Sequence, residues 1–276
     1  MIINNLKVVP DTYRDKKMED YENMSISEVQ RLAKQGDKDA LFEMAYRWTD
    51  DEEAPPQVWK AYWMGKAADK GNIDAIRIYA GMLTEMPFPV KNCKKALELY
   101  DKFAEECRKA GNYNGEAFAK IESGIILCEG LGLGNHRDHK KGVQLIGEAI
   151  KKKNELGKKI MFSQLLRLGE LYAMGYAQED EAPSKSDLEV AIEYLESAIS
   201  QFDNNNDDPR MLEHAKQLKD AQKQHLLVWK QDSKEYNHRV AIERRKKLEQ
   251  PTEVGRQIEY HLRKLQERFG YITSIN

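Results

Sequence analysis

Hydrophobic side chains recur along most of this chain at spacings of three and four residues. Residues 188–199 are one example, with Leu188, Ile192, Leu195 and Ile199 in this rhythm. Such spacing places the side chains on one face of an α-helix. No segment up to residue 203 shows the alternation that is typical of β-strands, and prolines and glycines separate the helical segments. The pattern predicts an all-α chain built from pairs of antiparallel helices.

The helical pairs repeat. Gly36 and Gly71 are 35 residues apart, and the same separation relates Ala40 to Ala75 and Ala61 to Ala96. Two longer units follow, and the first helix of every unit carries what we call an anchor pair: Met44-Ala45, Tyr79-Ala80, Ser123-Gly124 and Leu168-Gly169. The small second residue lets a neighbouring helix approach closely. A recurring unit of this size predicts stacked helix pairs.

Two stretches resemble a known family. Leu168 to Gly175, and Gly130 to Leu133 followed by Asp138 and Lys141, are similar to the Sel1-like repeat, a relative of the tetratricopeptide repeat. The resemblance covers residues 27–203 as four units after a half-unit helix. It implies an α/α superhelical solenoid that binds other proteins and has no chemistry of its own. The first repeat departs from the family, since residues 51–56 replace the usual glycine turn.

The composition divides the chain into three parts. Residues 1–26 are an N-terminal extension, residues 27–203 are the repeat solenoid, and residues 209–276 are a C-terminal helical extension. No proline or glycine interrupts residues 210–250, which predicts one long helix, and a shorter helix after Pro251 has an apolar stripe that ends at Phe269. These two helices are expected to cap the solenoid, to fold back as a hairpin or to form a homodimer.

The charges and cysteines narrow the class of protein. The 276 residues include 44 basic and 46 acidic side chains, a net charge of −2. No apolar segment is long enough to cross a bilayer, and the first 20 residues are charged, so we expect a cytoplasmic protein without membrane contact. Cys93, Cys107 and Cys128 are odd in number and never form Cys-x-x-Cys, which predicts packed reduced thiols.

Two motifs could carry chemistry. Residues 130–134 read Gly-Leu-Gly-Leu-Gly, but the third glycine is misplaced for a dinucleotide fingerprint, so a loop that needs positive φ is the favoured interpretation. His136, Asp138 and His139 could ligate a metal, although a cap by Asp138 at a helix start is favoured. No nucleophile elbow, metalloprotease or P-loop motif occurs. We therefore expect no catalytic residue, metal or cofactor, while a spatially assembled active site stays open.

The anchor pairs also predict where a partner binds. Positions two before and two after each anchor should line the inner curve of the solenoid, and the candidates are Phe42, Tyr46, Arg77, Ile121 and Glu170. Aromatic and charged side chains of this kind dominate the binding energy of protein interfaces. The apolar candidates are more readily core residues, whereas Tyr46, Arg77 and Glu170 favour the groove. The leading hypothesis is a non-catalytic adaptor that binds a protein or peptide.

A basic run suggests a second class of function. Residues 209–276 hold 15 basic and 9 acidic side chains, a net charge of +6 against −8 for the rest. The run itself consists of Arg244, Arg245, Lys246 and Lys247 and could contact an anionic ligand. Such a run more often forms a helix end that is exposed to solvent than a binding site. The alternatives are therefore a nucleic-acid-associated accessory protein, with nucleic acid the less favoured partner, or a regulatory subunit of an enzyme.

Overall fold

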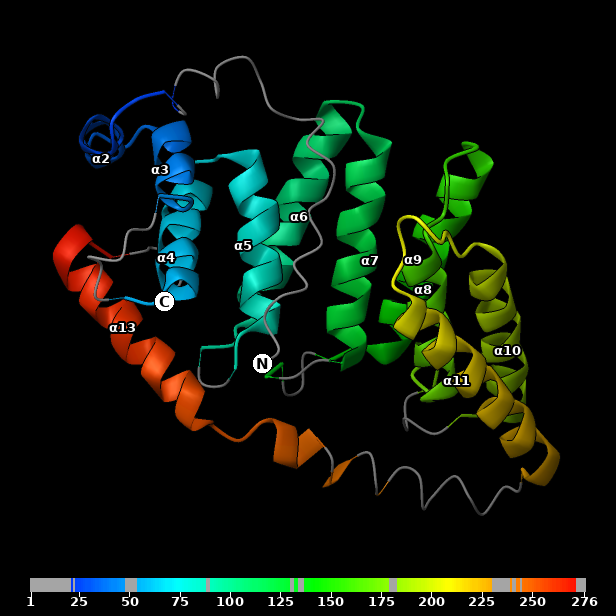
Figure 1. The fold of residues 1–276 in the computed structure, drawn as a ribbon. Coiled ribbons are helices and arrows are strands. Elements are labelled where there is room, and N and C mark those ends of the chain that lie inside the picture. Colours follow the sequence, from blue (N-terminus) through cyan, green and yellow to red (C-terminus); the bar gives the residue numbers. More distant parts are fainter. Residues whose placement is uncertain are drawn as a thin grey trace. The chain divides into compact units, whose positions relative to one another are not determined.

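The computed structural model describes residues 21, 23–47, 54–87, 90–129, 132–133, 137–178, 183–229, 239, 242–243 and 245–271. The regular elements within these residues are helices (Figure 1): α2 (Ile26–Lys34), α3 (Lys38–Met44), α4 (Pro56–Asp69), α5 (Ile73–Glu85), α6 (Cys93–Lys109), α7 (Tyr113–Glu129), α8 (His139–Glu155), α9 (Phe162–Ala173), α10 (Lys185–Ser200), α11 (Pro209–Val228) and α13 (Glu253–Phe269). The prediction of an all-α chain of helix pairs is confirmed. None of the helices searched in the described part combines the length and apolarity needed to span a membrane.

The chain divides into two compact units. Unit 1 comprises Met1–Tyr79 together with Tyr260–Asn276, and unit 2 comprises Ala80–Glu259. In unit 1, α3 packs against both α2 and α4, and in unit 2 successive helices from α6 to α11 pack against one another. The acidic residues 50–53 and 179–181 and the first 20 residues of the chain lie outside the described residues.

The recurring glycines form the turns that join one helix pair to the next. At the end of α4, the N–H of Gly71 donates to the carbonyl of Ala68 and that of Asn72 donates to Ala67, both at 3.0 Å. Gly71 has φ 83°, a left-handed conformation that glycine adopts without steric cost. The Asn72 side chain then accepts from the N–H of Ala75 at 2.8 Å and so begins α5. Gly36-Asp37 and Gly111-Asn112 repeat this arrangement.

The anchor pairs permit close helix contacts, as predicted. In unit 2, α7 crosses α8 at Gly124 and Gly142. A Cβ atom at Gly142 would lie 2.5 Å from both the carbonyl oxygen of Gly124 and the Sγ of Cys128. Gly169 meets Leu195 in the same way, since its Cβ would lie 2.9 Å from the Cγ of that leucine. The close approach at Gly142 and at Gly169 is possible only because glycine has no side chain.

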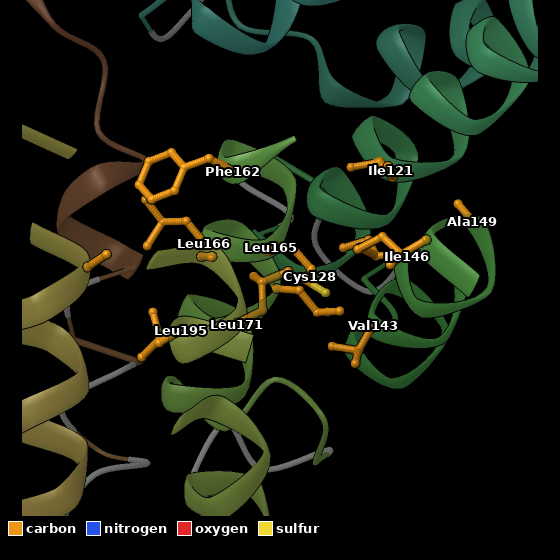
Figure 2. Close-up of a cluster of buried hydrophobic side chains, with 14 of the residues drawn as sticks. Ile121, Cys128, Val143, Ile146, Ala149, Phe162, Leu165, Leu166, Leu171 and Leu195 are labelled. Carbon is orange, nitrogen blue, oxygen red and sulfur yellow. The ribbon is translucent and has the colours of Figure 1, made fainter. Parts of the chain in front are cut away.

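A hydrophobic core joins the helices of unit 2. Figure 2 shows side chains from α7, α8, α9 and α10 converging on one another, with Cys128 among the leucines and isoleucines. Its members that are at most 2% exposed include Ile121, Ile146, Phe162, Leu166 and Leu171. Phe162 also makes a T-shaped ring contact with Phe202, 5.4 Å between centroids. The apolar stripes that the sequence shows are therefore the faces that hold this unit together.

Unit 1 has a different core, built from aromatic rings on α4. Trp59, Tyr62 and Trp63 are each at most 2% exposed, and Phe269 of α13 packs against all three at centroid distances of 5.2–6.2 Å. Lys66 donates to the carbonyl of Phe269 at 2.6 Å, and the Tyr62 hydroxyl donates to that of Gly270 at 2.6 Å. These donors satisfy carbonyls at the end of α13 that lack partners within the helix.

The C-terminal region differs in part from its prediction. The prediction of one helix over residues 210–250 is wrong. Helix α11 ends at Val228, and Trp229 adopts an extended conformation with ψ 129°. The indole N–H of Trp229 donates to the carbonyl of Pro183 at 3.3 Å, a tertiary contact that competes with helix continuation. The prediction of the last helix is confirmed. Helix α13 follows Pro251 and buries Leu262 and Leu265. It ends at Phe269, before Gly270 with φ 90°.

Candidate functional site

The predicted residues of unit 1 lie on α3 and α5. Tyr46, which follows the end of α3, is 52% exposed, and its ring contacts that of Phe42 at 5.4 Å. The ammonium group of Lys60 lies over the same ring, 4.6 Å from its centroid. Arg77 is half-buried and lies 3.9 Å from Asp74 on its own helix. Tyr46 and Arg77 thus present polar atoms at the surface of unit 1.

Two of the five predicted residues are buried. Phe42 is 6% exposed and Ile121 is 2% exposed, and Ile121 belongs to the hydrophobic core of unit 2. Their contribution is packing, because a side chain so enclosed has almost no surface to offer a partner. This is the alternative that the sequence favoured for the apolar candidates.

Glu170 in unit 2 belongs to a network of charged side chains. It accepts from Arg167 at 2.8 Å, and its other oxygen lies 3.0 Å from Nε2 of His214 on α11. Arg167 also forms an ion pair with Glu129 of α7. The network therefore connects α9 to α7 through Arg167 and to α11 through Glu170.

A further carboxyl group lies beside this network. Burial raises the pKa of Glu122 to about 7, an effect that Glu85 strengthens and Arg167 opposes. Glu122 and Arg167 occupy the same place in their repeats, one residue before the anchor pair. Sequence reasoning missed both because it took positions two residues from the anchor. Aligned repeats with a charged side chain at the same place were the signal that could have found them.

The basic run of the C-terminal region is only partly available to a ligand. Arg244 lies outside the described residues. Arg245 donates to the carbonyl of Glu129 at 2.8 Å, which ties its side chain to α7. Lys246 and Lys247 are exposed. Their contact with an anionic ligand stays a prediction.

The motifs with possible chemistry adopt structural roles where they are described. Gly132 has φ 84°, and helix α7, not a strand, precedes it, which is the favoured loop interpretation. The side chain of Asp138 accepts from the N–H of Lys141 at 2.9 Å and caps α8, as predicted. His139 is buried against the ring of Tyr176, and His136 lies outside the described residues. Within the described residues, no three His, Cys, Asp or Glu side chains gather as metal ligands.

The three cysteines are buried thiols. Burial raises the pKa of Cys93, and it raises the pKa of Cys128 to about 12. A thiol with such a pKa stays protonated near neutral pH and is a poor nucleophile. Cys93 and Cys128 therefore act as small packing residues.

Of the comparisons with known proteins, the one with solved structures found a match. No protein-family model and no curated protein matches the chain. A solved structure that it resembles is c5321, a protective antigen present in uropathogenic Escherichia coli strains that displays an SLR fold, that is, a Sel1-like repeat fold. The two share 14% sequence identity with a TM-score of 0.32. The alignment covers 88% of this chain and 50% of that one, so the chain spans about half the length of c5321.

The described residues form successive packed helix pairs, the architecture that the resemblance to the Sel1-like repeat implied. Successive helix pairs, glycine turns between them and close contacts at the anchor pairs are its features in the described residues. Some side chains on or just after the first helices are not fully buried by packing. Tyr46, Arg77, Arg167 and Glu170 are positions of this kind here, because each follows or belongs to a first helix and keeps part of its surface exposed.

Proposed function

We propose that this protein is a non-catalytic adaptor that binds a protein or peptide on the faces of its first helices. The observation that carries the proposal is the contrast between buried and exposed side chains in three of the first helices, α3, α5 and α9. The anchor residues Met44, Tyr79 and Leu168 are at most 1% exposed, whereas aromatic and charged side chains on the same helices or just beyond them reach the surface. Large side chains of these types supply most of the binding energy at protein interfaces.

The surface in unit 1 is prepared for an aromatic contact. The ring of Tyr46 contacts both Phe42 and the ammonium group of Lys60, so less rotational freedom remains to be lost when a partner covers it. The hydroxyl group of a half-exposed tyrosine can hydrogen-bond to a partner while the ring is buried. Tyr46 is therefore the residue of unit 1 that we expect to contribute most.

The surface in unit 2 favours a basic partner. The carboxyl groups of Glu129 and Glu170 both pair with the single guanidinium group of Arg167, and that of Glu122 interacts with it electrostatically. Such an excess of negative charge attracts lysine and arginine side chains and steers their approach. The positions of Arg167 and Glu170 are fixed by their mutual contact at 2.8 Å. We expect a peptide with basic residues to align along α7 and α9.

Two further parts of the proposal concern chemistry and location. The ionisable groups of the unit 2 surface pair with one another, which suits recognition better than acid–base catalysis. The buried thiols Cys93, Cys107 and Cys128 suit a reducing compartment, and we propose the cytoplasm.

The test is capture of partners from an extract of the native cell with the tagged full chain. The variant combines Tyr46→Ala, Arg77→Ala and Glu170→Ala. A matched control combines Lys102→Ala, Glu148→Ala and Glu189→Ala, three exposed positions on the second helices α6, α8 and α10. We expect at least about tenfold less captured partner for the variant and no change for the control. Equal recovery of the same proteins by variant and wild type would remove the assignment.

A further inference from the structure

A segment of the C-terminal region lies against the end of α7 in unit 2. Arg245 donates from Nη1 to the backbone carbonyl of Glu129 at 2.8 Å, and the carboxylate of Glu249 accepts from the N–H of Gly132 at 3.2 Å. These contacts join positions 116 and 117 residues apart in the sequence. We call residues 245–249, which read Arg-Lys-Lys-Leu-Glu, the basic segment.

The end of α7 has backbone groups that need partners. Glu129 is the last residue of the helix, so its carbonyl has no partner within α7, and the aligned peptide dipoles give this end a partial negative charge. A guanidinium group suits such a carbonyl because the hydrogen bond is charge-assisted. Gly132 adopts φ 84° and donates its N–H to a carboxylate. The end of α7 thus presents an acceptor and, three residues later, a donor.

The basic segment matches these two groups in its spacing. Arg245 and Glu249 are four residues apart, and residues 245–248 are helical, so the two side chains lie on one face of a short helical turn. The contacts are reciprocal, because the basic side chain meets the acceptor and the acidic side chain meets the donor. An arginine followed four residues later by a glutamate is therefore the pattern that this end of α7 recognises.

The basic segment lies on the surface of unit 2. Leu248 is 50% exposed, Lys246 and Lys247 are exposed, and Arg245 and Glu249 are half-buried. A segment that buries little apolar surface opens at a low cost in free energy. The basic segment can therefore detach from α7 without a change in the hydrophobic core.

The end of α7 also belongs to the acidic surface proposed above. The carboxylate of Glu129 pairs with Arg167, and Glu122 precedes Glu129 by about two helical turns on the same face of α7. A basic partner that these carboxylates attract arrives at the carbonyl to which Arg245 already donates. The lysines next to Arg245 add positive charge that repels other cations. The basic segment and a basic partner thus compete for the same helix end.

We propose that the basic segment is a resident competitor of the partner, and that the end of α7 recognises an Arg-x-x-x-Glu helix face in both. A partner helix with this pattern displaces the segment and takes over the carbonyl of Glu129 and the N–H of Gly132. The apparent affinity of the partner is then reduced by the fraction of molecules in which the site is occupied by the segment. The identity of the partner rests on the proposed adaptor function, whereas the site and its resident occupant do not.

The experiment uses the full chain and, as a probe, a capped synthetic peptide with the sequence of residues 242–250. Fluorescence anisotropy measures its binding to the wild type and to Arg245→Ala, which releases the resident segment. The matched control is Arg256→Ala, because Arg256 is an exposed arginine that pairs with Glu253 on its own helix. A second peptide carries Arg245→Ala and Glu249→Ala. Without any peptide, amide exchange of Gly132 measured by NMR reports whether the segment is docked.

We expect faster exchange at Gly132 and about tenfold tighter binding of the peptide in Arg245→Ala, and neither change in Arg256→Ala. Glu249→Ala, which removes the second contact, should act in the same direction, and the doubly substituted peptide should not bind. The NMR spectrum of each variant shows whether it is folded. Unchanged exchange at Gly132 in Arg245→Ala, or equal affinity of the peptide for this variant and the wild type, would overturn the inference.

Partner capture separates this inference from the proposed function. Arg245→Ala should capture more partner than the wild type does. Equal or lower capture by Arg245→Ala, together with loss of capture in the combined variant of Tyr46, Arg77 and Glu170, would overturn the competition and leave the adaptor function intact. Full capture by that combined variant, with the peptide results as expected, would remove the adaptor surface and leave the site at the end of α7 intact.

Discussion

Helix α4 in unit 1 packs through large aromatic rings, whereas α7 and α8 in unit 2 pack through glycine. Trp59 and Trp63 stand 5.6 Å apart between centroids in the first region, and Gly124 meets Gly142 backbone to backbone in the second. Both regions hold the second helix of a repeat. The same repeat architecture therefore accommodates helices that pack through large side chains and helices whose backbones touch directly.

The difference teaches where each region is vulnerable. An aromatic contact fails when a ring is removed, because a cavity remains. A glycine contact fails when an atom is added, because the adjoining backbone has no room to move. Four predictions follow this contrast from the largest expected effect to the smallest.

Trp59→Ala should lower the free energy of unfolding by about 4 kcal/mol. The indole is completely buried and also donates to the carbonyl of Met44 at 2.7 Å, so both packing and a hydrogen bond are lost. Urea denaturation measures the change. Tyr271→Ala, which alters a ring that is 70% exposed in the same unit, should change stability by less than about 0.5 kcal/mol. Equal effects of the two variants would contradict the aromatic core.

Gly142→Ala should cost about 3 kcal/mol, because its new Cβ would lie 2.5 Å from the carbonyl oxygen of Gly124. The matched control is Gly147→Ala on the same helix, where nothing lies within 4 Å of the new Cβ. That control should gain about 0.5–1 kcal/mol from the better helix propensity of alanine. Thermal unfolding of the two variants separates the effect of the helix contact from that of helix propensity. No loss of stability in Gly142→Ala would mean that α7 and α8 do not approach closely.

Glu122→Gln should stabilise the protein at alkaline pH by at most about 3 kcal/mol. The pKa of Glu122 is raised from 4.5 to about 7, so the folded state holds a proton that the unfolded state releases. Its favourable contribution is complete below about pH 4.5 and disappears as the pH rises through about 7. Denaturation at pH 5.5 and pH 8 should therefore show a loss in the wild type that the variant lacks. Parallel losses in both proteins would assign the pH dependence elsewhere.

Lys66→Met should cost about 1 kcal/mol, because the carbonyl groups of Phe269 and Gly270 lose a donor. The apolar stem of methionine keeps the packing on α4 largely intact. Hydrogen exchange should show faster opening at the end of α13. Lys70→Met, at an exposed position next to the end of α4, serves as the control and should leave α13 unchanged.

Much of the fold could be predicted because its signals are local. The helical rhythm, the capping carboxylate of Asp138 and the small anchor residues each act within a few positions of the chain. The end of α11 could not be predicted, because it depends on the contact between Trp229 and Pro183, which are far apart in the sequence. Likewise, nothing near residue 269 indicates that Phe269 packs on α4.

The candidate site was harder to predict for a related reason. A first helix lies against the second helix of its own pair and against neighbouring pairs, so more than one of its faces is buried. The spacing of residues within one helix does not show which of them is buried between neighbouring helices. Ile121 is buried in this way, whereas Tyr46 is not. The charged network around Arg167 depends on residues from α7, α9 and α11 together.

The most direct test of the adaptor proposal is hydrogen–deuterium exchange of the full chain with and without a partner protein that it captures from the native cell. The account predicts slower exchange in the partner complex at α3 with Tyr46, at α5 and at α9, and unchanged exchange in the second helices α6 and α10. Protection confined to α10 or α13, with the first helices unchanged, would contradict it.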